Sequence, residues 1–517
     1  MINVRTAFYD LLRQHGIDRI FGNPGSTELT MFTDFPEDFS YVGALQESVA
    51  LGIADSYAQT SGRPAVVNLH SSVGMGHAMG ALFTAYRNRT PLIVTAGQQS
   101  RPLLLHDPFL MANRPTELPQ PFVKWAVEPA RAADVPQALA RALSVATSYP
   151  QGPVFLSIPA EDWDEEAEAV AYRPPSPAPG PDPEQAVRVA EAMASAKAPA
   201  LVVGGEVDRD KGWEEVVAVA EALGAPVYIP PMEGRVGFPQ SHELFAGMLP
   251  PEPENIVRTL SPHDAILVFG ARVFTMHVDG PRPYVPTEAR IFQVSTDTDL
   301  LSAAPAGEAV QSSTRLAAAA IRDALGRPGT NYASRELPTA IAGDAIGYPF
   351  LFETLQRLRD PEAPIVEEAP TARRDLPDFL PVDRPDTFFT CSSGGLGFGM
   401  PAAVGAALAR PDKRTVAIIG DGSAMYAVQA LWTAAKQQAN VAFLILNNGR
   451  YAALDGFGRR FGIAEPPGCD LSGLDFVALA AGQNVPGSRV EKPEALEAAI
   501  KAVLEAQGPA LLDIAIG

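Results

Sequence analysis

The chain has 517 residues, a formal net charge of −20 and two cysteines. This length suits about three domains of ~150 residues each. The acidity and the lack of a basic cluster argue against nucleic acid or an anionic membrane surface as a partner. Two cysteines exclude a disulfide framework. No signal peptide and no apolar run of the ~20 residues that span a bilayer is recognised, so we expect a cytoplasmic enzyme.

The first part of the chain alternates strand-like and helical runs. Strands are predicted at residues 19–22, 41–45, 65–69 and 91–96. Ser26 follows the first of these strands, Glu47 follows the second and opens a helix, and His70 ends the third. Neighbouring strand ends of one sheet thus carry a hydroxyl, a carboxylate and an imidazole, which together are suited to acid–base chemistry.

Two connectors divide the chain. Residues 173–183 are too rich in proline for a helix or a central strand, and residues 326–331 form a second break. Between them, strands are predicted at 200–205, 226–230, 265–270 and 290–295. A plain Rossmann oxidoreductase is disfavoured because residues 203–206 lack the glycine spacing of that motif. We predict three consecutive doubly wound parallel-sheet α/β domains, at 1–172, 184–326 and 340–517.

The last domain holds the most informative pattern. A strand at 414–420 leads into Gly-Asp421-Gly-Ser, a helix is predicted at 424–438, and a strand at 440–446 leads into Asn-Asn448-Gly. A right-handed crossover brings both strand ends to one edge of the sheet, where such sheets bind ligands. A carboxylate and an amide oxygen there are ligands for Mg²⁺, and the glycines allow a diphosphate to approach.

The motifs at 21–26, 44–47, 68–70, 394–397, 420–424 and 447–449 resemble those of the thiamine-diphosphate-dependent decarboxylases, and within them the benzoylformate decarboxylase branch. The resemblance implies that the first domain binds the pyrimidine of thiamine diphosphate and the last its diphosphate. Asp421, Asn448 and the carbonyl of Arg450 would hold Mg²⁺, with Ca²⁺ as an acceptable substitute. No FAD is expected. It also implies a homo-oligomer, with a dimer as the minimum active unit and a tetramer built as a dimer of dimers.

The resemblance further implies a role for each site residue. Glu47 would bind the pyrimidine and promote cofactor activation, while His70, His277 and Ser26 would act on the substrate. The other cofactor contacts would come from Gly394, Leu396, Gly422, Ser423, Tyr426 and Tyr451. The substrate pocket would be lined by Phe109, Leu110, Leu454, Phe457 and Thr390.

The implied reaction is non-oxidative decarboxylation of a 2-keto acid through an enamine on the cofactor, with benzoylformate giving benzaldehyde and CO₂. An acetolactate-synthase-like carboligase joining 2-keto acids or aldehydes is the alternative. A flavin-dependent oxidase and a non-catalytic binding protein stay open. Pro370 and Thr390 depart from the family pattern, which has a hydroxyl-rich segment and an aromatic ring there. We therefore expect a roomier pocket that tolerates larger or branched keto acids.

Overall fold

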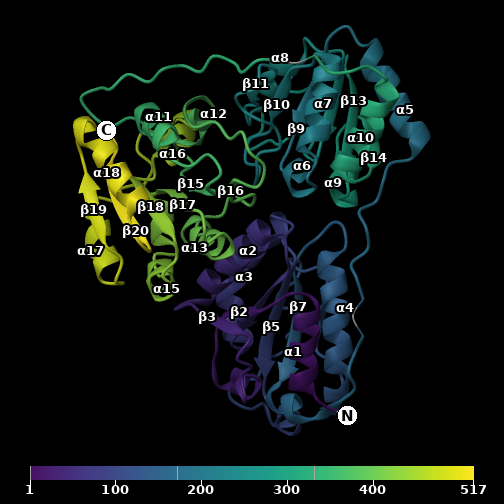
Figure 1. The fold of residues 1–517 in the computed structure, drawn as a ribbon, viewed down its shortest axis with the longest axis vertical. Helices are drawn as coiled ribbons and strands as arrows, with labels where there is room; N and C mark the ends of the chain where they lie inside the picture. The colour runs from purple at the N-terminus through teal and green to yellow at the C-terminus, as the bar shows by residue number, and fades with distance from the viewer. Residues whose placement is uncertain (1, 172, 331) are drawn as a thin grey trace.

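The computed structural model describes residues 2–171, 173–330 and 332–517. Three six-stranded sheets, all parallel, follow one another along the chain, each with helices on its faces (Figure 1). This confirms the predicted α/β class. The described residues include no helix with the length and apolar character that a membrane span requires.

The first sheet has the order β3-β2-β4-β5-β7-β6. Its strands are β2 (Arg19–Asn23), β3 (Ser40–Gly43), β4 (Ala65–Leu69), β5 (Leu92–Gln98), β6 (Ala126–Val127) and β7 (Val154–Pro159). Its helices are α1 (Val4–Gln14), α2 (Glu47–Ser61), α3 (Ser71–Arg87) and α4 (Val135–Thr147). A short antiparallel pair, β1 (Ile2–Asn3) with β8 (Glu166–Ala167), joins the two ends of this region.

The middle sheet has the order β11-β10-β9-β12-β13-β14. Its strands are β9 (Pro199–Val203), β10 (Val227–Ile229), β11 (Phe245–Met248), β12 (Ala265–Phe269), β13 (Arg290–Ser295) and β14 (Glu308–Gln311). Its helices are α5 (Pro183–Ser195), α6 (Glu206–Arg209), α7 (Trp213–Leu223), α8 (Pro253–Leu260), α9 (Thr298–Ser302) and α10 (Thr314–Leu325). The proline-rich residues 173–182 before α5 contain no helix or strand.

The third sheet has the order β16-β15-β17-β18-β20-β19. Its strands are β15 (Ile365–Glu368), β16 (Phe388–Thr390), β17 (Thr415–Gly420), β18 (Val441–Asn447), β19 (Gly487–Val490) and β20 (Ala510–Ala515). Its helices are α11 (Tyr348–Leu358), α12 (Leu376–Phe379), α13 (Gly399–Ala409), α14 (Asp421–Met425), α15 (Ala430–Lys436), α16 (Ala452–Arg460), α17 (Phe476–Ala481) and α18 (Pro493–Glu505).

Two predicted elements differ from the structure. The single helix predicted at 424–438 is two helices, α14 and α15, and the first begins at Asp421. Between them the amides of Tyr426 and Ala427 bond to carbonyls three residues back, and this tighter spacing turns the chain. The strand predicted at 41–45 ends at Gly43, and Gln46 then caps the start of α2 through its side chain.

Helices α2 and α13 join the first domain to the third (Figure 1). Both are rich in alanine and glycine, so their backbones approach closely. A Cβ on Gly405 of α13 would lie 2.1 Å from the carbonyl oxygen of Ile53 in α2, and one on Gly52 would lie 2.8 Å from Pro401. This contact fixes the first domain against the sheet that carries Asp421.

Candidate active site

The carboxyl ends of β17 and β18 hold the polar motif at one edge of the third sheet. The strands pair in parallel, with Gly420 beside Leu446, so Asp421 and Asn448 come off neighbouring strand ends. One carboxylate oxygen of Asp421 accepts from the Gly422 amide at 2.8 Å, and the other accepts from the Gly449 amide at 2.7 Å. Burial raises the pKa of Asp421, and the backbone donors around it partly offset that rise.

Asn448 is held by contacts on both sides of its amide. Its Nδ2 donates to the Tyr348 hydroxyl at 3.3 Å, and its Oδ1 accepts from the Arg450 amide at 3.1 Å. The guanidinium of Arg450 pairs with Asp455 at 2.9 Å. With its guanidinium paired to Asp455, Arg450 offers its backbone carbonyl as an oxygen donor of the same hard type as the Asp421 carboxylate and the Asn448 amide oxygen.

A cavity of about 400 Å³ opens beside this edge. Its wall includes His277 from the middle domain, which makes an edge-on ring contact with Phe457 of α16 at 4.8 Å between centroids. Most of the predicted site residues of the third domain line it: Gly394, Leu396, Asp421, Gly422, Ser423, Tyr426, Asn448, Arg450, Tyr451, Leu454 and Phe457. One half of the predicted constellation is therefore assembled within a single chain.

The other half lies on the first domain. Glu47 is the first residue of α2, is almost buried, and contacts His77 Nδ1 at 3.0 Å through Oε2. None of the residues that line the 400 Å³ cavity comes from the described part of the first domain. Thr84 Oγ1, two turns further along α3 than His77, meets Ser393 Oγ at 2.8 Å. His77 and Thr84 are about 10 Å apart along α3, and Glu47 is not among the residues that line the third-domain cavity in one chain.

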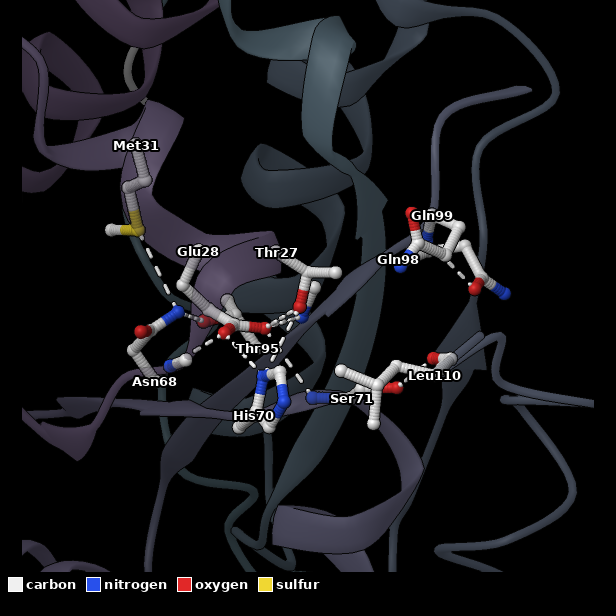
Figure 2. A network of polar contacts seen from close by, with 12 residues as sticks. Thr27, Glu28, Met31, Asn68, His70, Ser71, Thr95, Gln98, Gln99 and Leu110 are labelled. Atoms are coloured by element: carbon white, nitrogen blue, oxygen red, sulfur yellow. Dashed lines mark hydrogen bonds and ion pairs between the residues drawn. The ribbon is translucent and has the colours of Figure 1, made fainter. Parts of the chain in front are cut away.

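Ser26 and His70 lie close to a buried carboxylate that sequence reasoning missed. Figure 2 shows Glu28 among His70, Thr27 and Ser71. The glutamate is buried, with 1% of its surface exposed. His70 Nδ1 lies 2.8 Å from Glu28 Oε2, while the amides of Gly25 and Gly97 donate to the carboxylate at 2.8 Å each. Because a carboxylate only accepts, it keeps the His70 proton on Nδ1 and leaves Nε2 as the acceptor.

A sequence signal for Glu28 exists. It is the third residue of the short helix Ser26–Phe32, and its side chain reaches back to the Gly25 amide, which is capping-box spacing. The burial of the same carboxylate under β5 could not be read from that spacing.

Phe109 and Leu110 lie on the first domain and not at the cavity. The Phe109 side chain is 86% exposed, and the Leu110 carbonyl accepts from the Ser71 hydroxyl at 2.8 Å. Leu110 therefore lies beside the Glu28 network (Figure 2), and the Phe109 carbonyl accepts from Gln99 Nε2 at 2.7 Å.

Comparison with known proteins matches all three domains to one family. Residues 2–114 match the N-terminal TPP binding domain of thiamine pyrophosphate enzymes, residues 187–321 match their central domain, and residues 372–514 match their C-terminal TPP binding domain. The chain belongs to the thiamine pyrophosphate enzymes.

Individual relatives agree along the full length. The chain is 40% identical to a benzoylformate decarboxylase of Pseudomonas aeruginosa, with 99% of each protein covered. It is 25% identical to the acetolactate synthase isozyme 3 large subunit of Escherichia coli, over 96% of this chain and 91% of that one. A solved thiamine diphosphate-dependent 4-hydroxybenzoylformate decarboxylase from Rhodococcus jostii superposes with a TM-score of 0.96, at 37% identity, covering 100% and 99% of the two chains.

The donor set of this thiamine pyrophosphate enzyme fits a divalent cation shared with a diphosphate. Asp421 supplies an anionic oxygen, Asn448 an amide oxygen and Arg450 a carbonyl, all from two neighbouring strand ends. Mg²⁺ takes such hard oxygen ligands and completes its shell with phosphate oxygens and water. Among the described residues, no group of three or more His, Cys, Asp or Glu side chains could hold a metal ion.

Thr390 is not where the sequence placed it. It does not line the 400 Å³ cavity, and its hydroxyl donates to Glu367 Oε2 at 2.9 Å. The Arg373 side chain occupies the adjoining space and donates to the Thr390 hydroxyl at 2.8 Å. The Arg373 side chain therefore adjoins Thr390 in this chain, and the expectation of a roomier pocket stays a prediction.

Proposed function

We propose that this chain decarboxylates a 2-keto acid without oxidation, with benzoylformate giving benzaldehyde and CO₂ as the representative reaction. The observation that carries the proposal is the cavity in which the Asp421 and Asn448 oxygens, His277 and the apolar side chains of Leu454 and Phe457 meet. The 40% identity over the full length to a benzoylformate decarboxylase supports the same reaction.

Thiamine diphosphate would occupy this cavity, and when bound it supplies a carbon nucleophile and a ring that accepts the electron pair released with CO₂. Asp421, Asn448 and the Arg450 carbonyl would hold Mg²⁺, with Ca²⁺ able to replace it. Gly394, Leu396, Gly422, Ser423, Tyr426 and Tyr451 would contact the cofactor. No flavin is part of the proposal.

The remaining residues act on the pyrimidine and the substrate. Glu47 would hydrogen-bond a ring nitrogen of the pyrimidine. His277 would hold or move a proton at the substrate from the middle-domain side. His70, with Nε2 free to accept, would do so from the first-domain side together with Ser26. A positioned proton-transfer group of this kind typically contributes ~10²–10⁴-fold to turnover. Phe109 and Leu110 would line the apolar part of the pocket.

A second copy of the chain would bring the two halves together. Large apolar side chains are exposed near the Glu47 half, at Leu45, Val73 and Phe109, and near the cavity, at Leu454 and Phe461. Exposed apolar patches of this kind mark interaction sites. We therefore propose a dimer as the minimum active unit and a tetramer as a dimer of dimers. The proposed domain boundaries are 1–172, 184–326 and 340–517, and the proposed location is the cytoplasm.

The test begins with protein stripped of metal and cofactor. Thiamine diphosphate and Mg²⁺ are added back together and separately, and CO₂ and aldehyde are measured with a panel of aromatic and aliphatic 2-keto acids. The proposal expects release of both products from benzoylformate only when both additions are present. Formation of a hydroxyketone in place of free aldehyde would favour the carboligase, the class of the acetolactate synthase relative.

Glu47→Gln separates binding from activation. The variant should retain cofactor affinity yet slow exchange of the acidic cofactor proton with solvent by at least about tenfold, which corresponds to ~1.4 kcal/mol of barrier. Exchange at the wild-type rate in a saturated variant would remove Glu47 from that role.

A further inference from the structure

Three polar residues form a closed group behind the 400 Å³ cavity. Glu367 lies near the carboxyl end of β15 and pairs with Thr390 of the parallel strand β16. Arg373 follows β15 and its side chain reaches back to both. Arg373 Nε donates to Glu367 Oε2 at 2.8 Å and Nη2 donates to Thr390 Oγ1 at 2.8 Å. The Thr390 hydroxyl closes the ring by donating to Glu367 Oε2.

Burial makes these three residues depend on one another. Glu367 is completely buried and Thr390 nearly so, and the second oxygen of Glu367 accepts from the Ala369 amide at 2.5 Å. A buried carboxylate needs a charged partner, since removing the partner leaves an uncompensated buried charge and is strongly destabilising. Glu367, Arg373 and Thr390 are thus one structural unit.

The guanidinium still has donors to spare. Of its five N–H groups, the ring uses one on Nε and one on Nη2. Nη1 makes no hydrogen bond with any described residue, and 15% of the Arg373 side chain remains exposed. Arg373 forms part of the cavity wall together with Pro370 and Ala372, and Nη1 is the guanidinium nitrogen with no partner among the described residues.

We propose that Arg373 determines substrate specificity by donating a hydrogen bond from Nη1 to a neutral acceptor oxygen at the far end of an aromatic 2-keto acid. The inference rests on the proposed decarboxylase function and names the substrate class that this site selects. An aryl ring would lie against Leu454 and Phe457, and its distal oxygen would reach the guanidinium.

Local charge selects a neutral acceptor over an anion. Glu367 already balances the charge of Arg373. Glu368, the next residue, is buried in the same wall, where its carboxylate accepts from the amides of Gly397 and Gly399. Desolvation raises the pKa of Glu368 to about 7, so near neutrality it carries partial negative charge. A substrate with an anionic tail would meet net repulsion.

The experiment compares two nearly isosteric substrates, 4-methoxybenzoylformate and 4-ethylbenzoylformate, which differ by an ether oxygen in place of a CH₂ group. The ratio of their kcat/KM values is measured in the holoenzyme. Comparing this ratio between variants cancels the intrinsic electronic effect of the substituent. Arg373→Met should lower the methoxy-to-ethyl ratio at least about fivefold, since the variant loses a hydrogen bond from a charged donor.

Two companion variants protect the test from misfolding. Arg373→Met alone leaves the Glu367 charge unpaired, so Glu367→Gln/Arg373→Met removes both charges together, a change that is often neutral for stability. The double variant should show the same reduced ratio. Glu367→Gln alone keeps the donor and is the matched control, in which the ratio should stay within about twofold of wild type. Arg373→Lys keeps the buried charge and should lower the ratio, because a point charge lacks the planar fork.

The outcomes separate the inference from the proposed function. An unchanged ratio in the folded double variant, with both substrates turned over, overturns the role of Arg373 and leaves the decarboxylase function standing. A wild-type enzyme that prefers a 4-carboxylate substrate over 4-methoxybenzoylformate overturns the choice of a neutral acceptor. If the wild-type holoenzyme turns over no aromatic 2-keto acid, the proposed function and this inference both fail.

Discussion

Replacing Glu28 by glutamine should destabilise the first domain far more than its conservative chemistry suggests. The carboxylate accepts from the amides of Gly25 and Gly97 and from Thr27 Oγ1 at 2.7–2.8 Å, besides its contact with His70 (Figure 2). A glutamine amide has one acceptor oxygen. Whichever way it turns, its NH₂ group faces either the Gly25 or the Gly97 amide, and that buried donor loses its acceptor.

The magnitude follows from these contacts. An unsatisfied buried donor costs ~1–3 kcal/mol, and the remaining hydrogen bonds lose the extra strength of a charged acceptor. We expect a total of about 2–4 kcal/mol, or roughly 4–16 °C in the melting temperature of a domain of this size. Calorimetry on the cofactor-free protein measures the loss, and amide exchange at Gly97 reports it locally.

Glu37→Gln is the matched control, because Glu37 is an exposed carboxylate of the same domain with no hydrogen bond or ion pair found to the described residues. Its effect should lie within about ±0.5 kcal/mol. Should Glu28→Gln unfold at the same temperature as Glu37→Gln, with the Gly97 amide equally protected, the carboxylate is not what holds this network together.

Three further outcomes are expected. Asp421→Ala should weaken Mg²⁺-dependent binding of thiamine diphosphate at least about tenfold by calorimetric titration, because it removes the anionic metal ligand, and unchanged affinity would exclude Asp421 from the metal site. Gly405→Ala should destabilise the contact between α2 and α13 by ~1–3 kcal/mol, since its Cβ would lie 2.1 Å from the Ile53 carbonyl oxygen. A Cβ at Gly80 would meet nothing within 4 Å, so Gly80→Ala is the control and should not be destabilised in this way. Equal denaturation midpoints for the two variants would contradict this. Burial raises the pKa of Asp55 from 3.8 to about 6, so the folded state binds the extra proton and the free energy of unfolding falls as pH rises from about 4 to 6, by up to ~3 kcal/mol. Asp55→Asn should remove that part of the pH dependence, and parallel stability profiles for the two proteins would count against it.

The strand ends were the most predictable part of the site. Runs of buried aliphatic residues define β17 and β18. Parallel pairing with a right-handed crossover then brings Asp421 and Asn448 to the same edge of the sheet. Glu47 at the start of α2 was predictable for the same reason, because a polar residue after a strand and before an apolar helical run marks a helix start.

Contacts between distant segments were not predictable in this way. The Glu28 carboxylate accepts from the amides of both Gly25 and Gly97 because β5 lies against the turn that follows β2. Arg373 reaches Thr390 across 17 residues of sequence, and neither residue alone signals the other. A pattern based on one position at a time took Thr390 to leave space, whereas the structure places a side chain from another segment beside it.

The sequence by itself determined the three parallel-sheet domains, the edge that holds Asp421 and Asn448, and the family, because these depend on local periodicity and on short motifs whose geometry is set within one βαβ unit. Only the tertiary structure decided that Glu47 does not line the cavity within one chain, that His70 contacts Glu28, and that Arg373 lines the cavity. These outcomes depend on which buried charges and volumes meet once the segments pack, and packing couples residues that the sequence keeps far apart.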